Sequence, residues 1–261
     1  MSPAGLRRQL LASLSLGLAP VALAQGLRLR KQALRLPEAA GERTGALPGT
    51  ASDPLPPVRL LAVGESPLAG VGLQCPQETV TCRLAERIRQ SSQQTVHWRI
   101  LARGGLTAAA VRHKLLPHLP TEPVDLILIG LGVNDSVALR SARRWQRDLE
   151  ALIDDLHARS GPAPVLLAGV PDMHHFPLLP NPLRLLLGTR SRLLDHAAAR
   201  LAANRDDAIY VPMGLDGRSA GLFCEDGFHP NQAGHEAWAE QLAPAAGQLL
   251  SRSHEQAARG N

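Results

Sequence analysis

Aromatic residues are scarce in this sequence, where they make up 3% of the 261 residues. So few rings disfavour a stacking surface for single-stranded nucleic acid. Lysine is almost absent as well, and the 28 basic residues, nearly all of them arginines, are scattered along the chain among 23 acidic ones. A dispersed excess of this size favours a solvated arginine-rich surface over a nucleic-acid groove. We therefore expect a core of Leu, Val, Ile and Ala, and no nucleic acid as a partner.

Cysteine is rare too. Cys75, Cys82 and Cys224 are odd in number and lack C-x-x-C spacing, so the sequence indicates neither a zinc site nor a complete disulfide framework. Free thiols packed as small apolar groups are expected, and a single bridge between Cys75 and Cys82 in an oxidising compartment is the alternative. No metal site is expected.

Long apolar runs are missing except near the N-terminus. Residues 10–24 form a largely apolar stretch of 15 residues that contains Pro20, whereas a membrane-spanning helix needs about 20. Two arginines precede the stretch, and the triplet A-L-A closes it before Gln25. This order of basic, apolar and small residues resembles a secretory signal with its cleavage site before Gln25.

Basic residues follow this stretch closely, at Arg28, Arg30, Lys31 and Arg35. Positive charges directly after an apolar segment resist translocation. Segment 1–24 is therefore predicted either as the cleaved signal of an exported (periplasmic or secreted) protein or as an uncleaved segment that associates with a membrane. The sequence leaves cytoplasmic residence open.

Residues 58–261 are predicted to form one folded domain after a linker at residues 25–57, because the chain from Leu36 to Pro57 is rich in Pro, Gly, Ala and Thr with little apolar periodicity. Within the domain, aliphatic runs predict five strands at Val58–Val63, Val96–Leu101, Val124–Ile129, Val165–Val170 and Ala208–Val211. Helical patterns follow at Glu78–Ser92, Thr107–Leu116, Ala142–Arg159, Leu183–Ala203 and Gln232–Leu250. Apolar strands that alternate with helices indicate a five-stranded, mostly parallel sheet covered on both faces. Ligands of such sheets bind beyond the carboxyl ends of the strands.

A serine follows the first predicted strand directly, in the segment Gly64-Glu65-Ser66-Pro67. Its place at the end of a strand, beside a glycine that permits a tight turn, makes Ser66 a candidate nucleophile. An equally good interpretation is a helix N-cap, because serine caps helices and proline suits the first helical turn. The G-x-S-x-G elbow of α/β-hydrolases does not fit, since Leu68 occupies the place of its second glycine.

An aspartate and a histidine three residues apart, Asp226 and His229, stand just before the last predicted helix. A nucleophilic serine needs a base that accepts its proton and a carboxylate that orients that base. Taken alone, the D-x-x-H spacing is better explained by chance on a surface. In combination with Ser66 it predicts a Ser-His-Asp set.

Two further loops follow the second and third predicted strands. One contains Gly104 and Gly105, and the other contains Asn134 and Asp135. Acyl transfer needs hydrogen-bond donors aimed at the developing oxyanion, and an asparagine amide and a glycine N–H can supply them. The alternative is that both segments are only turns.

These four segments, in this order and at these separations, resemble the sequence blocks of the SGNH hydrolases, also called the GDSL esterase/lipase family. The resemblance implies a flavodoxin-like three-layer α/β/α sandwich. It also implies a serine esterase that cleaves carboxylic esters through an acyl-serine intermediate, without a metal or organic cofactor. Ser66 would be the nucleophile, His229 its base and Asp226 the orienting carboxylate. The Ser66 N–H, the Gly105 N–H and the Asn134 amide would form the oxyanion hole, and Gly104 matches less well.

Two residues depart from the family's pattern. Glu65 replaces the usual aspartate, and Pro67 stands where leucine, threonine or a small residue is common. Neither change removes a catalytic atom, and Glu65 is expected to be an acceptor that stabilises the loop. His174 and His175, after the fourth predicted strand, are candidates for substrate contact, because a metal site there would lack further ligands at matching spacing.

The resemblance implies a small-molecule ester as the substrate, with a short acyl, lipid or acetylated-sugar group, and it selects none of these. Two other functions stay open: an acyltransferase at the same site, and a non-catalytic module that binds an acyl or sugar group. No heptad pattern is evident, so a monomer is the default expectation.

Overall fold

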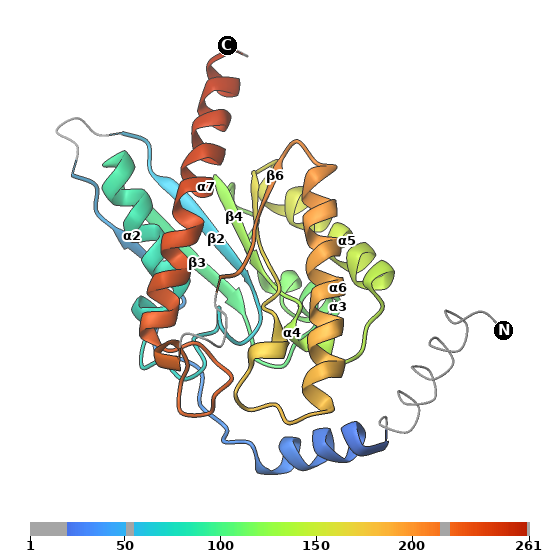
Figure 1. The fold of residues 1–261 in the computed structure, drawn as a ribbon. Helices are drawn as coiled ribbons and strands as arrows, with labels where there is room; N and C mark the ends of the chain where they lie inside the picture. Colours follow the sequence, from blue (N-terminus) through green and yellow to red (C-terminus); the bar gives the residue numbers. More distant parts are fainter. Residues whose placement is uncertain (1–19, 51–54, 215–219, 260–261) are drawn as a thin grey trace.

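A six-stranded sheet forms the centre of the computed structural model, which describes residues 20–50, 55–214 and 220–259 (Figure 1). Its strands are β1 (Thr44–Leu47), β2 (Val58–Gly64), β3 (Val96–Ala102), β4 (Leu126–Gly130), β5 (Val165–Ala168) and β6 (Ala208–Val211). Their order across the sheet is β1-β3-β2-β4-β5-β6, and every neighbouring pair is parallel except β1 with β3. The mostly parallel sheet is confirmed, with six strands instead of five.

The extra strand, β1, lies inside the segment predicted as a linker. It pairs antiparallel with β3, from Thr44 opposite Arg99 to Leu47 opposite Val96. Gly45 permits this pairing, because a Cβ at that position would lie 2.5 Å from the ring of Trp98. The strand has four residues that are exposed or half-exposed, and it therefore lacks the aliphatic run by which the other strands are recognised.

Helices cover both faces of the sheet. The α-helices are α2 (Val80–Ser92), α3 (Ala108–Lys114), α4 (Val133–Val137), α5 (Ala142–Ser160), α6 (Leu183–Ala203) and α7 (Gln232–Arg259). Short 3-10 helices occur at η1 (Pro76–Glu78), η2 (Leu116–His118), η3 (Met173–His175) and η4 (Ala220–Leu222). Leu60 and Ala62 of β2 pack with α2 and α7, whereas Leu61 and Val63 pack with α3, α5 and α6. Alternate residues of one strand thus enter two cores, which confirms the three-layer α/β/α arrangement.

One more helix precedes β1. Residues 20–32 are helical and lie beyond the carboxyl ends of the strands, where Figure 1 draws them in blue. The helix runs across the cleavage position predicted before Gln25, and the first part of segment 1–24 falls outside the described residues. Among the residues that the structure describes, no helix is both long and apolar enough to cross a membrane.

Candidate active site

Ser66 lies just past the carboxyl end of β2, where the sequence places it. The chain continues from Gly64 through a bend and a series of turns up to residue 72, and no helix begins at Ser66. The alternative interpretation of Ser66 as a helix N-cap is therefore wrong. Gly64 is required at this point, because a Cβ there would lie 2.5 Å from the carbonyl oxygen of Gly130. Ser66 itself is largely enclosed, with 8% of its surface exposed.

Asp226 and His229 are brought together by a tight turn. Gly227 adopts a φ of 61°, in the left-handed region that favours glycine. The N–H groups of Phe228 and His229 both donate to Asp226 Oδ1, at 2.9 and 3.0 Å. The second carboxylate oxygen, Oδ2, lies 2.6 Å from His229 Nδ1. One buried carboxylate thus holds both the backbone and the ring of the histidine.

The imidazole of His229 connects this carboxylate to the serine. Its Nε2 lies 3.0 Å from Ser66 Oγ, although the two residues are 163 positions apart in sequence. Burial alone would raise the pKa of Asp226, but the hydrogen bonds from His229 and Phe228 outweigh it and hold this pKa below its ordinary value. Because an ionised carboxylate only accepts, Nδ1 carries the ring hydrogen and Nε2 presents a lone pair to the hydroxyl. Such a chain can take up the proton of the serine.

Glu65 occupies the other side of Ser66. Its Oε1 accepts the N–H of Val133 at 2.8 Å, and its Oε2 accepts the N–H of Asn134 at 2.9 Å and the Asn134 side-chain Nδ2 at 2.5 Å. The same Nδ2 also donates to the carbonyl oxygen of Leu106 at 3.2 Å. Glu65 is thus an acceptor that ties the β2 loop to the start of α4. Both hydrogens of the Asn134 amide are engaged.

Burial has the largest effect on the pKa values of two carboxyl groups near Asn134, those of Glu65 and Asp135. It raises the pKa of Glu65 to about 7, although the hydrogen bonds from Asn134 and Val133 oppose it. Burial also raises the pKa of Asp135 to about 6, against the hydrogen bond that its Oδ2 accepts from the N–H of Ala108 at 2.9 Å. Asp135 joins the start of α3 to α4, so it braces the turn that carries Asn134.

The turn with two glycines supplies backbone donors near Ser66. A Cβ on Gly104 would lie 3.6 Å from Ser66 Cβ, so this turn runs beside the serine. The Gly104 N–H donates to Glu38 Oε1 at 2.7 Å. By contrast, within the described part of the chain the N–H groups of Gly105 and Ser66 donate no hydrogen bond to the protein. Gly105 has a φ of 78°, which favours glycine there.

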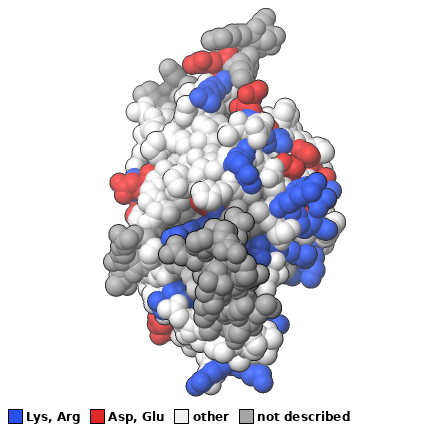
Figure 2. All heavy atoms as spheres, turned by 45° about the vertical axis from the view of Figure 1, so that its right-hand side comes forward, with Lys and Arg blue, Asp and Glu red and all other residues white. Residues whose placement is uncertain are grey.

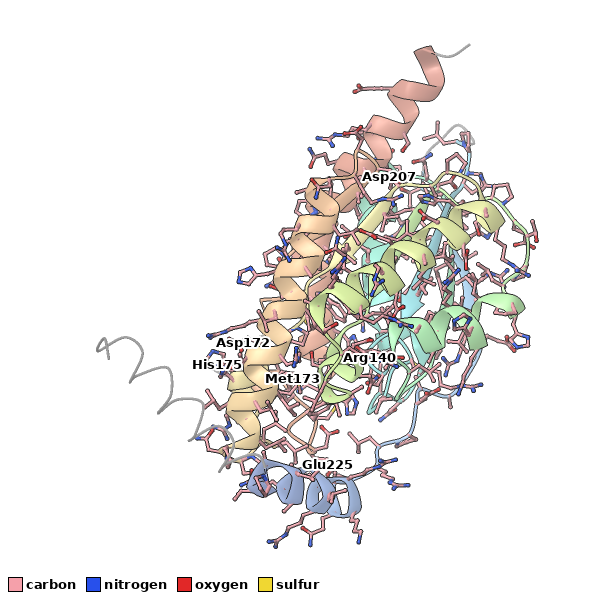
Figure 3. The ribbon with its side chains drawn as sticks, turned by 90° about the vertical axis from the view of Figure 1, so that its right-hand side faces the viewer. Arg140, Asp172, Met173, His175, Asp207 and Glu225 are labelled. Atoms are coloured by element: carbon pink, nitrogen blue, oxygen red, sulfur yellow. The ribbon has the colours of Figure 1, made fainter. Side chains whose placement is uncertain are left out.

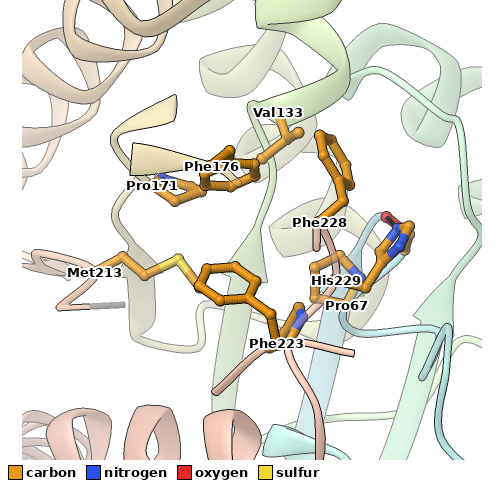
Figure 4. Close-up of a pocket in the computed structure, with 10 residues that line it drawn as sticks. Pro67, Val133, Pro171, Phe176, Met213, Phe223, Phe228 and His229 are labelled. Atoms are coloured by element: carbon orange, nitrogen blue, oxygen red, sulfur yellow. Dashed lines mark hydrogen bonds between the residues drawn. The ribbon is translucent and has the colours of Figure 1, made fainter. Parts of the chain in front are cut away.

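An apolar pocket opens next to Ser66 and His229 (Figure 4). Its cavity volume is about 20 Å³. All three phenylalanines of the chain line it, together with Pro67, Val133, Pro171, Met213 and Pro230. The ring of Phe176 meets those of Phe223 and Phe228 edge to face, with centroids 5.7 and 5.1 Å apart. Sequence reasoning missed this lining. The clustering of the rare phenylalanines in the loops after strands was the available signal.

His174 and His175, the predicted substrate-contact residues, do not line this pocket. His174 Nδ1 lies 2.7 Å from Asp172 Oδ1, and His175 Nε2 lies 3.5 Å from Asp172 Oδ2. Arg192 of α6 binds the same carboxylate at 2.7 Å. Figure 3 shows Asp172 and His175 beside α6. Met173 between them is fully buried. The loop therefore turns its apolar residue inward, and Asp172, which both histidines contact, attaches the loop to α6 through Arg192.

His235 and the three cysteines have surroundings that are typical of structural residues. His235 is fully buried, and its Nδ1 accepts the N–H of Val80 at 3.0 Å. Burial lowers the pKa of His235 to about 3. Cys75, Cys82 and Cys224 are free thiols. Within the described residues no cluster of His, Cys, Asp and Glu is arranged to hold a metal ion.

A comparison with models of known protein families shows to which family the chain belongs. Residues 62–237 match the model of the GDSL-like lipase/acylhydrolase family, a range that contains Ser66, Asn134, Asp226 and His229. The chain belongs to this family. It is therefore an ester-hydrolysing enzyme, as the sequence resemblance implies. Comparison with curated proteins gives no match.

Solved structures show the same fold. A lipase from a goat rumen metagenome superposes with a TM-score of 0.61 at 17% identity, covering 72% of this chain and 97% of that one. An esterase from Pseudoalteromonas superposes with a TM-score of 0.55 at 19% identity, covering 74% and 98%. The structure of TesA gives 0.53 at 23% identity, covering 73% and 99%. All three neighbours align with most of their own length.

Proposed function

We propose that the protein is a serine esterase in which Ser66 forms the acyl-enzyme. The observation that carries this proposal is the continuous set of contacts from Asp226 through His229 to Ser66, at 2.6 and 3.0 Å. In the first step Ser66 Oγ attacks the ester carbonyl carbon while His229 Nε2 takes the hydroxyl proton. His229 then gives that proton to the leaving alcohol as the C–O bond breaks. Water, activated by the same imidazole, releases the acid and restores Ser66.

The oxyanion of the tetrahedral intermediate would be held by three donors: the Ser66 N–H, the Gly105 N–H and the Asn134 amide. The first two have no acceptor within the described residues, which supports this assignment. The Asn134 amide has two acceptors, and its bond to the Leu106 carbonyl is longer than its bond to Glu65 by 0.7 Å. We therefore propose that the hydrogen now directed at Leu106 turns to the oxyanion.

The pocket beside Ser66 supports a short acyl group. Its walls are apolar, and its cavity volume is small, at about 20 Å³. Longer chains would require the rings of Phe176, Phe223 or Phe228 to move. We propose that acetyl esters are the preferred class and that the alcohol part lies outside this pocket.

Ser66→Ala tests the nucleophile. Turnover of p-nitrophenyl acetate should fall at least about a thousandfold, because the acyl-enzyme cannot form. The matched control is Ser141→Ala, which removes the side-chain cap of α5 on the surface and should leave turnover unchanged. The Pseudoalteromonas structure carries a monoethylphosphonate inhibitor, so intact-mass analysis after treatment with a reactive phosphonate should find one adduct on the wild type and none on Ser66→Ala.

Two results would count against the proposal. Full turnover by a folded Ser66→Ala protein would remove Ser66 as the nucleophile. Folded wild type that hydrolyses no p-nitrophenyl ester from acetate to octanoate would favour the binding module instead. The acyltransferase alternative predicts that an added acceptor alcohol diverts the acyl group from water to a new ester, which product analysis detects.

A further inference from the structure

The helix at residues 20–32 is seated on the apolar cluster that surrounds the pocket. Ala22 is 3% exposed and belongs to the same cluster as Val133 and Phe176, and Leu29 packs against that cluster. Gln25 fastens the helix to the start of α6: its Nε2 donates to the carbonyl oxygen of Asn181 at 2.7 Å, and its Oε1 accepts the N–H of Leu183 at 3.1 Å. One face of this helix is therefore part of the fold.

The opposite face of the helix is apolar and exposed. Leu23 and Leu27, one helical turn apart, are 65% and 54% exposed. Arg28, Arg30 and Lys31 are exposed on either side of them. A helix that buries one side in the protein and presents leucines flanked by basic side chains on the other is typical of an interfacial segment. A solvated helix face would carry mixed charges instead.

The charge of this region has one sign. No acidic residue occurs in the first 37 positions. Among the described residues, no ion pair engages the four basic side chains that follow the apolar stretch, at Arg28, Arg30, Lys31 and Arg35. Figure 2 shows Lys and Arg side chains at the lower tip of the molecule, the end at which Figure 1 draws the helix. Unpaired cations of this kind are complementary to an anionic surface.

Other exposed apolar side chains lie at the same end. Leu185 and Leu186 begin α6 beside the attachment point of Gln25 and are 56% and 39% exposed. Val137 and Leu139, in the segment after β4, are 51% and 48% exposed. Leu55, by contrast, precedes β2 at the amino end of the sheet. Apolar side chains gathered on one end of a molecule mark an interaction surface.

We propose that this end of the molecule, formed by the outer face of helix 20–32 and the first turn of α6, docks on an anionic lipid bilayer and turns the pocket beside Ser66 toward the membrane. The leucines enter the boundary between headgroups and acyl chains, and the basic residues contact the headgroups. A nucleic acid would bind the basic side chains but would leave the exposed leucines in water, so it accounts for only part of this surface. A second copy of the chain, docked symmetrically, would bring the unpaired cations of two helices together.

Co-sedimentation with lipid vesicles tests the docking without any measurement of activity. The full chain is mixed with vesicles of phosphatidylcholine alone or of phosphatidylcholine with phosphatidylglycerol. We expect the wild type to bind the anionic vesicles. Removing three charges in R28Q/R30Q/K31Q should weaken that binding about a hundredfold, because each basic residue near an anionic surface contributes about fivefold. The test uses the full chain, which keeps helix 20–32 whole.

A second variant separates the apolar contribution. L27Q/L185Q/L186Q should weaken binding at least about tenfold with the cations intact. The matched controls are K114Q/R200Q/R252Q and Leu55→Gln, which remove three exposed cations and one exposed leucine elsewhere on the molecule; both should bind as the wild type does. All variants should hydrolyse a water-soluble ester at the wild-type rate, since none of these side chains lines the pocket.

Several outcomes would overturn the docking surface. The proposal would be wrong if the wild type did not sediment with anionic vesicles. It would also be wrong if the control K114Q/R200Q/R252Q lost as much binding as R28Q/R30Q/K31Q. Binding to duplex DNA that depends on the three charges and ignores the three leucines would favour nucleic acid. A dimer in sedimentation velocity that L27Q/L185Q/L186Q dissolves, without vesicle binding, would assign the surface to a second copy.

Discussion

The two sides of the candidate site differ in how far their groups are already arranged. On one side, Ser66, His229 and Asp226 form unbroken contacts, and each donor points at its acceptor. On the other side, the Asn134 amide is occupied by Glu65 and by the carbonyl oxygen of Leu106. The contacts from Asp226 to Ser66 are thus continuous, whereas under the proposed mechanism the Asn134 amide has to exchange one acceptor for the substrate. This difference predicts how the two sides respond to substitution.

The largest effect is expected among the continuous contacts from Asp226 to Ser66. Asp226→Asn replaces an acceptor with an amide, which cannot accept two backbone N–H groups and the Nδ1 hydrogen as the carboxylate does, so the imidazole loses its tautomer. We expect kcat for p-nitrophenyl acetate to fall about 10⁴-fold. Glu225→Gln, an exposed neighbour, is the control for the loss of one charge and should keep full kcat. A drop below about tenfold in Asp226→Asn would mean that the carboxylate does not orient the base.

The next largest effect is expected at the Asn134 side-chain amide, whose hydrogens are donated to Glu65 and Leu106. Asn134→Ala removes the side-chain amide and should lower kcat about 10² to 10³-fold with little change in KM, because the lost bond is made to the developing oxyanion. Asn204→Ala, at the exposed end of α6, is the control and should have no effect on kcat. If Asn134→Ala raised KM and left kcat unchanged, the amide would bind substrate in its ground state and would not belong to the oxyanion hole.

Glu65 should have a smaller effect, exerted through Asn134. Glu65→Ala leaves the N–H groups of Val133 and Asn134 and the amide of Asn134 without their acceptor, so we expect kcat to fall about tenfold through loss of orientation. Glu65→Asp, shorter by one methylene, should recover part of that loss. The two variants are compared by their kcat and KM and by circular dichroism. An Asp variant no better than Ala, with an intact fold, would argue against positioning by this carboxylate.

The smallest effect is on stability and depends on pH. Burial raises the pKa of folded Glu65 from an ordinary 4.5 to about 7, so the folded state holds this proton more tightly than the unfolded chain does. The stabilisation from the protonated carboxyl is complete below about pH 4.5 and is lost as the pH rises through 7. Relative to Glu65→Gln, which does not ionise, the wild-type Tm should therefore decline by a few degrees between pH 5 and 8. Parallel Tm curves for the two proteins would mean that Glu65 does not titrate in this range.

Much of the fold could be predicted because it rests on local pattern. The strand Ala208–Val211 and the helix Leu183–Ala203 have the predicted bounds, since a buried strand reads as a continuous aliphatic run and a helix as a periodic one. β1 escaped prediction because its four residues are at most half-buried and its partner β3 lies about fifty residues further along the chain. β1 forms only because it pairs with β3 at the edge of the sheet, and the pattern of residues 44–47 does not specify that partner.

The candidate site, too, could be predicted from the sequence only in part. The residues of the D-x-x-H segment and the serine after β2 were found by spacing and by family resemblance, and the structure brings them together. His174 and His175 were chosen because they follow a strand, yet the chain turns there so that Met173 enters the core and the histidines reach Asp172. Which side of a loop faces a pocket depends on the packing of its neighbours, which a single sequence does not contain.

By itself, the sequence determined the order of the five aliphatic strands and of the longer helices between them, the D-x-x-H spacing of Asp226 and His229, and the family resemblance, because these depend on residues close together or on the order of short segments along the chain. Only the tertiary structure decided that Glu65 occupies the Asn134 amide, that three scarce phenylalanines enclose a small pocket, and that helix 20–32 packs beside it. These contacts join segments far apart in sequence, and they form only when the parallel sheet brings the carboxyl ends of its strands to one edge.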